Sequence, residues 1–208
     1  MITYKFVIDI TRSNINNIPA VYLFLNKLFQ WLEQGAASEI CNRKKNYVGI
    51  YFSDADFQLE QKNCSCSSVF ERGEDFLKDF ANRKILNGCQ DGKDDVMDAL
   101  NLAIHVGRTP EAGKVAKDII FLFTDQTLEE EYEFLPAENR ELRGVFLFAD
   151  YSVNTKEKDF MGISFPILSN YRTAEPAIQY DWNVLKETAK GIPDSIIFPL
   201  EKFMGMQF

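Results

Sequence analysis

Residues 118–125 read DIIFLFTD, an apolar run between Asp118 and the pair Thr124-Asp125. A run without polar alternation is typical of a strand that is covered on both faces of a parallel sheet. The run stops at a hydroxyl and a carboxylate, where the chain must leave the strand. We therefore predict a central strand over residues 118–124 that delivers an acidic side chain to one edge of a sheet.

A second strand of the same kind is predicted near the N-terminus, over residues 2–10. It contains Phe6-Val7-Ile8 followed directly by Asp9, so it also ends in a carboxylate. Further strands are predicted over residues 47–52 and 144–148, in a short segment ending at Phe70, and over residues 163–168 and 195–200.

Helices are predicted between these strands. Apolar residues recur at helical spacing after Pro19, which suits a first helical turn, and Gly35 is a plausible end. The other helices are predicted over residues 74–86, from a cap at Asp94 or Asp95 to near Gly107, over residues 129–141 with a break near Pro136, and over residues 182–190.

Strands thus alternate with helices along the chain, and this order predicts an α/β fold. We expect a three-layer, Rossmann-like, mostly parallel central sheet with helices on both faces, formed by residues 1–208 as a single domain. Right-handed crossovers bring the carboxyl ends of the strands to one edge, where open α/β sheets bind their ligands. Asp9 and Asp125 are therefore expected to lie at that edge.

Composition limits the function classes. The 208 residues have a formal net charge of -8, which argues against the nucleic-acid backbone as main partner. No apolar run is long enough for a membrane helix, and no signal peptide is evident. The four cysteines are interpreted as reduced thiols in a cytoplasmic protein, although Cys64, Cys66 and Cys89 leave a zinc site as a weaker alternative.

Three segments are expected to supply oxygen ligands at the sheet edge. The first is Asp9-x-Thr11-x-Ser13, the second is Asp125, and the third is the loop over residues 90–95, with Asp91 or Asp94 as the ligand. Carboxylates and hydroxyls without nearby His or Cys suit a hard cation, so Mg²⁺, or Mn²⁺ or Ca²⁺, is the predicted cofactor.

These segments resemble those of the von Willebrand factor type A (vWA) domains. Asp9-Ile10-Thr11-Arg12-Ser13 is similar to the family's D-x-S-x-S segment, and Thr124-Asp125 to its later strand that ends in a site Asp. Residues 91–100, DGKDDVMDAL, resemble a stretch of intracellular bacterial-type members, in which the loop offers Asp in place of Thr. The middle loop here has no Thr, and Gln126 follows Asp125 where a small residue is common.

The resemblance implies a metal-ion-dependent adhesion site (MIDAS) in a protein-binding or scaffold module that is not an enzyme. Its metal ligands would be Asp9, Thr11, Ser13, Asp91 and Asp125, and an acidic side chain of a protein partner would complete the metal shell. Neither a nucleic acid nor a membrane is expected as partner.

Other interpretations stay open at this point. The chain could be a Mg²⁺-dependent phosphohydrolase with Asp9 as nucleophile, although Thr11 stands where such enzymes have a second acid. It could also be a degenerate scaffold of the same fold that binds no metal. The Asp residues at the strand ends could merely form turns, and Ser13 could merely cap a helix. His105 is interpreted as a packed or surface residue.

Overall fold

The computed structural model describes residues 1–11, 14, 18–34, 44–53, 64–83, 93–124 and 138–148. In chain order, the elements are β1 (Ile2–Asp9), α1 (Ile18–Gln34), β2 (Lys45–Phe52), β3 (Cys64–Cys66), α2 (Gly73–Ala81), α3 (Lys93–His105), β4 (Ala116–Phe123) and β5 (Arg140–Phe148).

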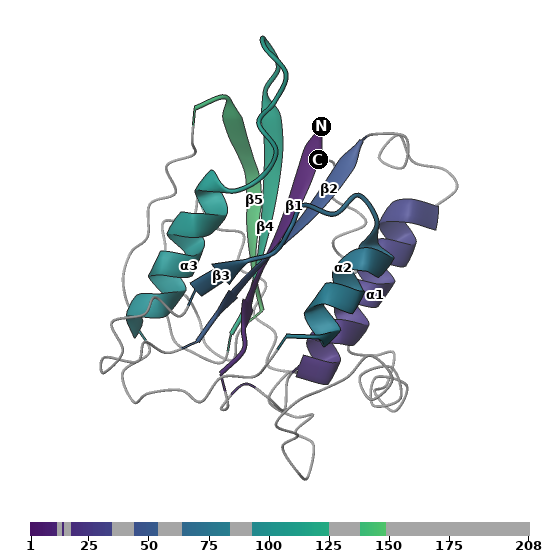
Figure 1. Ribbon diagram of the computed structural model, residues 1–208, viewed down its shortest axis with the longest axis vertical. Coiled ribbons are helices and arrows are strands. Elements are labelled where there is room, and N and C mark those ends of the chain that lie inside the picture. The colour runs from purple at the N-terminus through teal and green to yellow at the C-terminus, as the bar shows by residue number, and fades with distance from the viewer. Residues whose placement is uncertain are drawn as a thin grey trace.

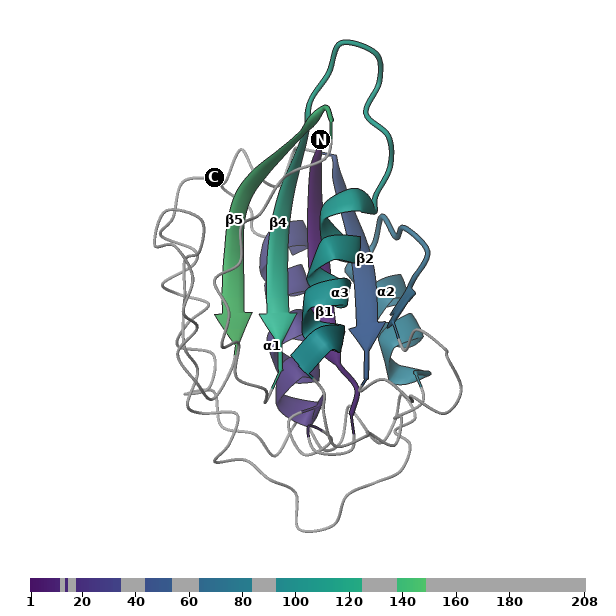
Figure 2. The same cartoon turned by 90° about the vertical axis from the view of Figure 1, so that its left-hand side faces the viewer.

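The described strands form one five-stranded sheet in the order β3-β2-β1-β4-β5. Strand β1 pairs in parallel with both β2 and β4, and β4 pairs in parallel with β5. Only β3 runs antiparallel, at the edge next to β2. The parallel strands lie side by side with their carboxyl ends in one direction, as Figure 2 shows. The predicted mostly parallel α/β sheet is confirmed.

Helices cover both faces of this sheet, with α1 and α2 on one face and α3 on the other (Figure 1). Side chains of a strand alternate between faces, and so two hydrophobic cores result. Phe6 and Ile8 of β1 pack with α1 and α2, whereas Val7 between them packs with α3. No described helix has both the length and the apolar composition needed to cross a membrane.

The core under α1 and α2 is aromatic. Phe6 makes edge contacts with Phe29 of α1 and Phe76 of α2 and stacks on Phe121 of β4, with ring centroids 5.0 to 5.4 Å apart. At the start of α2, a Cβ on Gly73 would collide with the ring of Phe29, so only glycine permits this close approach of the two helices. The Gly73 N–H also donates to Oε1 of Glu33 at 2.6 Å, which caps α2 from the end of α1.

The core under α3 is mostly aliphatic, although Phe52 of β2 also belongs to it. Buried residues recur along α3 at helical spacing, namely Val96, Ala99, Leu100 and Ala103. The two alanines let the helix lie close to the sheet. They contact a layer of strand residues that includes Val7, Val48, Ile50, Ile120 and Leu122.

Several predicted element bounds are wrong. Strand β5 begins at Arg140 and not at residue 144, and the short strand near Phe70 is Cys64–Cys66, with Phe70 in an isolated bridge to Tyr47. Helix α2 ends at Ala81 and not near residue 86, because Asn82 turns the backbone and Arg83 folds back to pair with Asp79 and stack over the Tyr51 ring. Helix α3 begins at Lys93, so Asp94 and Asp95 lie in its first turn and do not precede it.

The predicted helix over residues 129–141 cannot extend to its stated end. Asn139 has a left-handed φ of 61°, which asparagine tolerates, and β5 begins directly after it at Arg140. Strand β5 also contains a bulge. Asp118 pairs with Leu142 but Ile119 pairs with Gly144, so β5 has one residue more than β4 at this point. The strands and helices predicted beyond residue 150 lie outside the described residues.

Candidate metal centre

The centre of the site is Asp9, the last residue of β1. Its side chain is fully buried, and Oδ1 accepts a hydrogen bond from the backbone N–H of Thr11 at 2.9 Å. A carboxylate that accepts from the N–H two residues later forms an Asx turn, which ends the strand. The same contact orients the carboxylate toward the backbone of Thr11.

Thr124 brings the end of a second strand to the same carboxylate. It follows β4 directly, is buried, and donates from Oγ1 to Oδ2 of Asp9 at 2.8 Å. The two residues are 115 positions apart in the chain, and they meet because β1 and β4 are adjacent parallel strands. The predicted convergence of these strand ends is therefore present for Asp9 and Thr124.

Asn14 holds the backbone of Asp9 at the end of β1. Its Nδ2 donates to the backbone carbonyl of Asp9 at 2.8 Å, and its side chain is buried. The sequence places Asn14 in a turn-rich stretch, but nothing in the pattern singles it out from Asn16 or Asn17. A side chain that bonds the backbone five residues earlier is a contact that only the folded loop reveals.

The predicted ligands differ in how far the structure describes them. Asp9 and Thr11 are described and buried, and they lie together at the carboxyl edge. Ser13, Asp91 and Asp125 lie outside the described residues, and of Asp94 only its place in α3 is described. By sequence, Asp125 follows Thr124 directly, and Asp91 precedes α3 by two residues.

The donors around Asp9 allow a test of whether a cation fits. Both described contacts to the carboxylate come from neutral groups, a backbone N–H and a hydroxyl. Both contacts hold the carboxylate in a fixed orientation at the carboxyl edge of the sheet. Carboxylate and hydroxyl oxygens are also the donors that hard cations prefer. Asp9 and Thr11 therefore fit a divalent cation, although the described residues alone contain no group of three acidic, His or Cys ligands.

His105 takes no part in this site. It is the last residue of α3, it is exposed, and its Nδ1 lies 2.8 Å from the carbonyl oxygen of Asn101 one turn earlier. Of the two alternatives left open for this residue, packed or on the surface, the structure shows the surface one.

Comparisons with known proteins give only structural matches. No family model matches the sequence, and no curated protein matches it significantly. Solved structures that match include proximal thread matrix protein 1 from the mussel byssus, with 13% identity and a TM-score of 0.44 over 95% of this chain. The pilus adhesin SpaC from Lactobacillus rhamnosus GG matches with 12% identity and a TM-score of 0.46 over 94% of this chain.

A further match is the mussel protein with a zinc-occupied MIDAS motif, with 13% identity and a TM-score of 0.43. This chain covers 47% of the mussel protein and 30% of the adhesin. Identities and TM-scores this low assign no function and no metal. The α/β fold class rests on the strand order and on the helices that cover both faces of the sheet.

Proposed function

We propose that this chain is a divalent-cation-dependent protein-binding module with a MIDAS-like site at the carboxyl edge of its sheet. The observation that supports it best is the 2.8 Å contact between Thr124 and the buried carboxylate of Asp9. This contact joins the ends of two central strands, each of which leads into a loop with a predicted oxygen ligand. The proposed ligand set is Asp9, Thr11, Ser13, Asp91 and Asp125.

The position of this contact favours ligand binding. Open α/β sheets bind ligands beyond the carboxyl ends of their strands, and Asp9 lies at that edge. A bound Mg²⁺ would supply a positive charge and an open coordination position for an acidic side chain of a partner. The chain's residues hold the carboxylate in place through the N–H of Thr11, the hydroxyl of Thr124 and, on the backbone, the amide of Asn14.

Binding is proposed in preference to catalysis. The described donors around Asp9 are a backbone N–H and a hydroxyl on its carboxylate and an amide on its backbone carbonyl, and these groups do not exchange protons near neutral pH. Thr11 also stands where a phosphohydrolase with Asp9 as nucleophile would have a second acid. The setting is proposed to be cytoplasmic, and the partner to be a protein.

Titration calorimetry with Mn²⁺ and Mg²⁺ tests the proposal. Asp9→Asn is the informative variant, because the amide keeps one oxygen for the buried donors while it removes the charge. We expect wild type to bind and Asp9→Asn to lose binding. Asp98→Asn is the matched control, since Asp98 is an exposed carboxylate on α3, and it should bind like wild type.

The same samples separate the alternatives. A cation that binds only the native state raises the melting temperature, so Mg²⁺ should stabilise wild type and a chelator should reverse this. An unchanged melting temperature together with silent calorimetry would favour a scaffold that binds no metal. Hydrolysis of p-nitrophenyl phosphate by wild type, lost in Asp9→Asn, would replace the binding role with the phosphohydrolase.

A further inference from the structure

A buried lysine, Lys5, lies on the α3 face of the sheet, away from the candidate metal centre. Lys5 is in the middle of β1, between Val48 and Ile120 in register, and its side chain has no solvent exposure. Its Nζ donates to Oδ2 of Asp118 at 2.8 Å and to the backbone carbonyls of Ala103 and Ile104 at 2.5 and 3.3 Å. The ammonium group thus has three acceptors, two of which belong to the last turn of α3.

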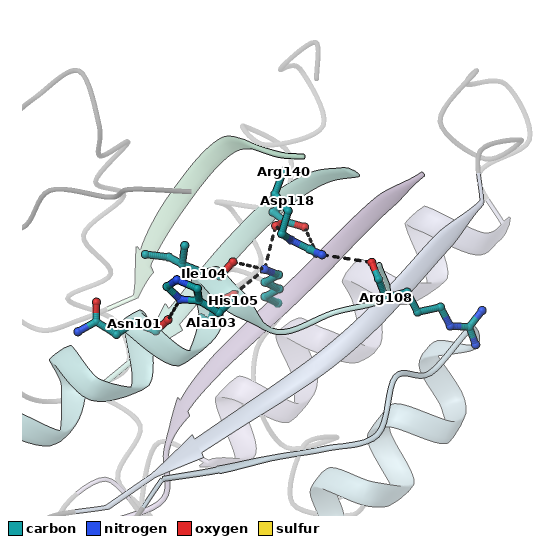
Figure 3. A network of polar contacts seen from close by, with 8 residues as sticks. Asn101, Ala103, Ile104, His105, Arg108, Asp118 and Arg140 are labelled. Carbon is teal, nitrogen blue, oxygen red and sulfur yellow. Dashed lines mark hydrogen bonds and ion pairs between the residues drawn. The ribbon is translucent and has the colours of Figure 1, made fainter. Parts of the chain in front are cut away.

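Asp118 also binds a second cation. Arg140, the first residue of β5, donates from Nε and Nη2 to the two carboxylate oxygens at 2.6 and 2.7 Å. Its Nη1 donates to the carbonyl of Arg108, in the loop that follows α3, at 3.2 Å. Figure 3 shows Asp118 between Arg140 and the end of α3. The end of the helix and the start of its following loop are therefore both tied to one carboxylate.

Burying a charged side chain at a strand position is energetically unfavourable. Taking an ammonium group out of water costs several kcal/mol, and an apolar side chain would fill the space without that cost. Burial lowers the pKa of Lys5 from its ordinary value of 10.5 to about 8, while the nearby Asp118 opposes this shift. What Lys5 provides and an apolar residue cannot is directional hydrogen bonding to the carbonyls at the end of α3.

Directional contacts matter because the rest of this interface is apolar. Ala99 and Ala103 lie against aliphatic strand residues, and hydrophobic contacts have little directional preference. Small side chains also offer little resistance to sliding along the sheet. The bonds from Lys5 to Ala103 and Ile104 fix the axial position of α3 at its C-terminal end.

The first turn of the same helix lies toward the carboxyl ends of the strands (Figure 2). Helix α3 begins at Lys93, two residues after Asp91, and its 13 residues make a rod about 20 Å long. A hydrogen-bonded helix changes its length little, so its C-terminal attachment also determines where its first turn lies. The middle loop of the proposed site joins that first turn.

We propose that Lys5 is a positioning residue that sets the cation affinity of the sheet-edge site by holding α3 at a fixed position along the sheet. This inference rests on the proposed function, because it needs the loop before α3 to supply a ligand. Lys5 itself touches neither Asp9 nor any proposed ligand in the described contacts.

Lys5→Met is the variant that tests it. Methionine fills similar space and removes the bonds to the helix, while Asp118 keeps its pair with Arg140. Two quantities are measured, Mn²⁺ affinity by calorimetry and amide hydrogen exchange of residues 96–105. We expect Mn²⁺ affinity to fall about tenfold, within the range of typical coupling between sites. Exchange in α3 should become faster, with α1 and α2 unchanged.

Ile120→Val is the matched control. Ile120 pairs with Lys5 in register, faces the same helix and lacks any bond to its carbonyls. It should lower stability slightly and leave Mn²⁺ affinity unchanged. Lys5→Gln is a second variant should Lys5→Met fail to fold. Its shorter amide cannot reach both carbonyls, and so the same direction of change is expected in both measurements.

Each result has a defined meaning. Unchanged Mn²⁺ affinity in folded Lys5→Met, or an equal loss in Ile120→Val, overturns the inference. If wild type binds no Mn²⁺, the proposed function and the inference both fail. Exchange data then still show whether Lys5 holds α3: faster exchange in Lys5→Met would leave a purely structural role, and unchanged exchange would remove that role too.

Discussion

The sheet face covered by α3 has one buried aspartate toward each end, and the two differ in their partners. Asp118 is bonded by two cations, Lys5 and Arg140. The described donors to Asp9 include the N–H of Thr11 and the hydroxyl of Thr124. The contacts of Asp118 tie α3 and β5 to the start of β4, whereas the described contacts of Asp9 join the ends of β1 and β4 at the carboxyl edge.

The largest effect is expected from removing the carboxylate of Asp118, which pairs with Lys5 and Arg140. Asp118→Ala leaves Lys5 and Arg140 buried without their carboxylate, and unpairing a buried ion pair lowers the free energy of unfolding by about 3–5 kcal/mol. Urea denaturation measures this. Asp98→Ala, which removes an exposed carboxylate from α3, is the control and should not destabilise the protein. Equal stability of the two variants would mean that the buried pairing contributes little.

A pH titration sharpens the comparison with a somewhat smaller effect. The pKa of Lys5 is about 8 in the folded protein because of burial, and 10.5 is its ordinary value. The unfolded chain therefore binds more protons between these values, so this residue makes stability rise with pH from about 8 to 10.5, by up to roughly 3 kcal/mol. The charged groups that act on Lys5 are Asp118, Arg140 and Cys66.

Lys5→Met supplies the reference for this titration. Other groups also titrate at alkaline pH; burial raises the pKa of Tyr22 to about 12, and this residue makes stability fall above about pH 10. The contribution of Lys5 is the difference between wild type and Lys5→Met in urea denaturation from pH 7.5 to 10, an interval set by the Lys5 and tyrosine values. Parallel curves for the two proteins would contradict a lowered pKa for Lys5.

At the opposite end, Thr124→Val tests the contact that joins the two strand ends. Valine has the same shape but removes the hydroxyl, and a hydrogen bond to a charged group contributes about 2 kcal/mol to stability. We also expect weaker Mn²⁺ binding, because Asp9 loses one of the groups that orient it. Thr109→Val, at an exposed hydroxyl, should change neither. A Thr124→Val protein with unchanged stability would show that the contact is dispensable.

The smallest effect is expected from an exposed ion pair of Arg108, whose backbone carbonyl accepts from Arg140. Arg108 pairs with Glu71 at 2.5 Å, but both side chains are largely exposed, at 42% and 55%. Solvent and salt screen such pairs, so Arg108→Ala should change the free energy of unfolding by no more than about 0.5 kcal/mol. The backbone carbonyl of Arg108, which accepts from Arg140, is retained. A much larger loss would mean that the loop after α3 stabilises the buried cluster through this side chain.

Sequence patterns predicted the sheet well because its central strands are continuous apolar runs. The positions of Asp9 and Thr124 followed from the rule that parallel strands end at one edge. Lys5 was not predicted to be buried, since its partners lie 98 to 113 residues away and no local pattern announces them. The end of α2 was placed too late for a similar reason, because Arg83 is drawn back by Asp79 and Tyr51. The roles of Ser13, Asp91 and Asp125 as metal ligands remain predictions, because these residues lie outside the described ones.

The bulge in β5 has a consequence for insertions and deletions. Register partners on either side of it are Asp118 with Leu142 and Ile119 with Gly144, so Arg143 is an additional residue. Loss of one residue at this point would give a regular strand with every existing pair retained, including Ala116 with Arg140. A one-residue loss in β4 just after Asp118, by contrast, would turn Asp118 to the opposite face of the sheet from Ile120 and Leu122. Natural length variation in this sheet is therefore expected to concentrate at Arg143.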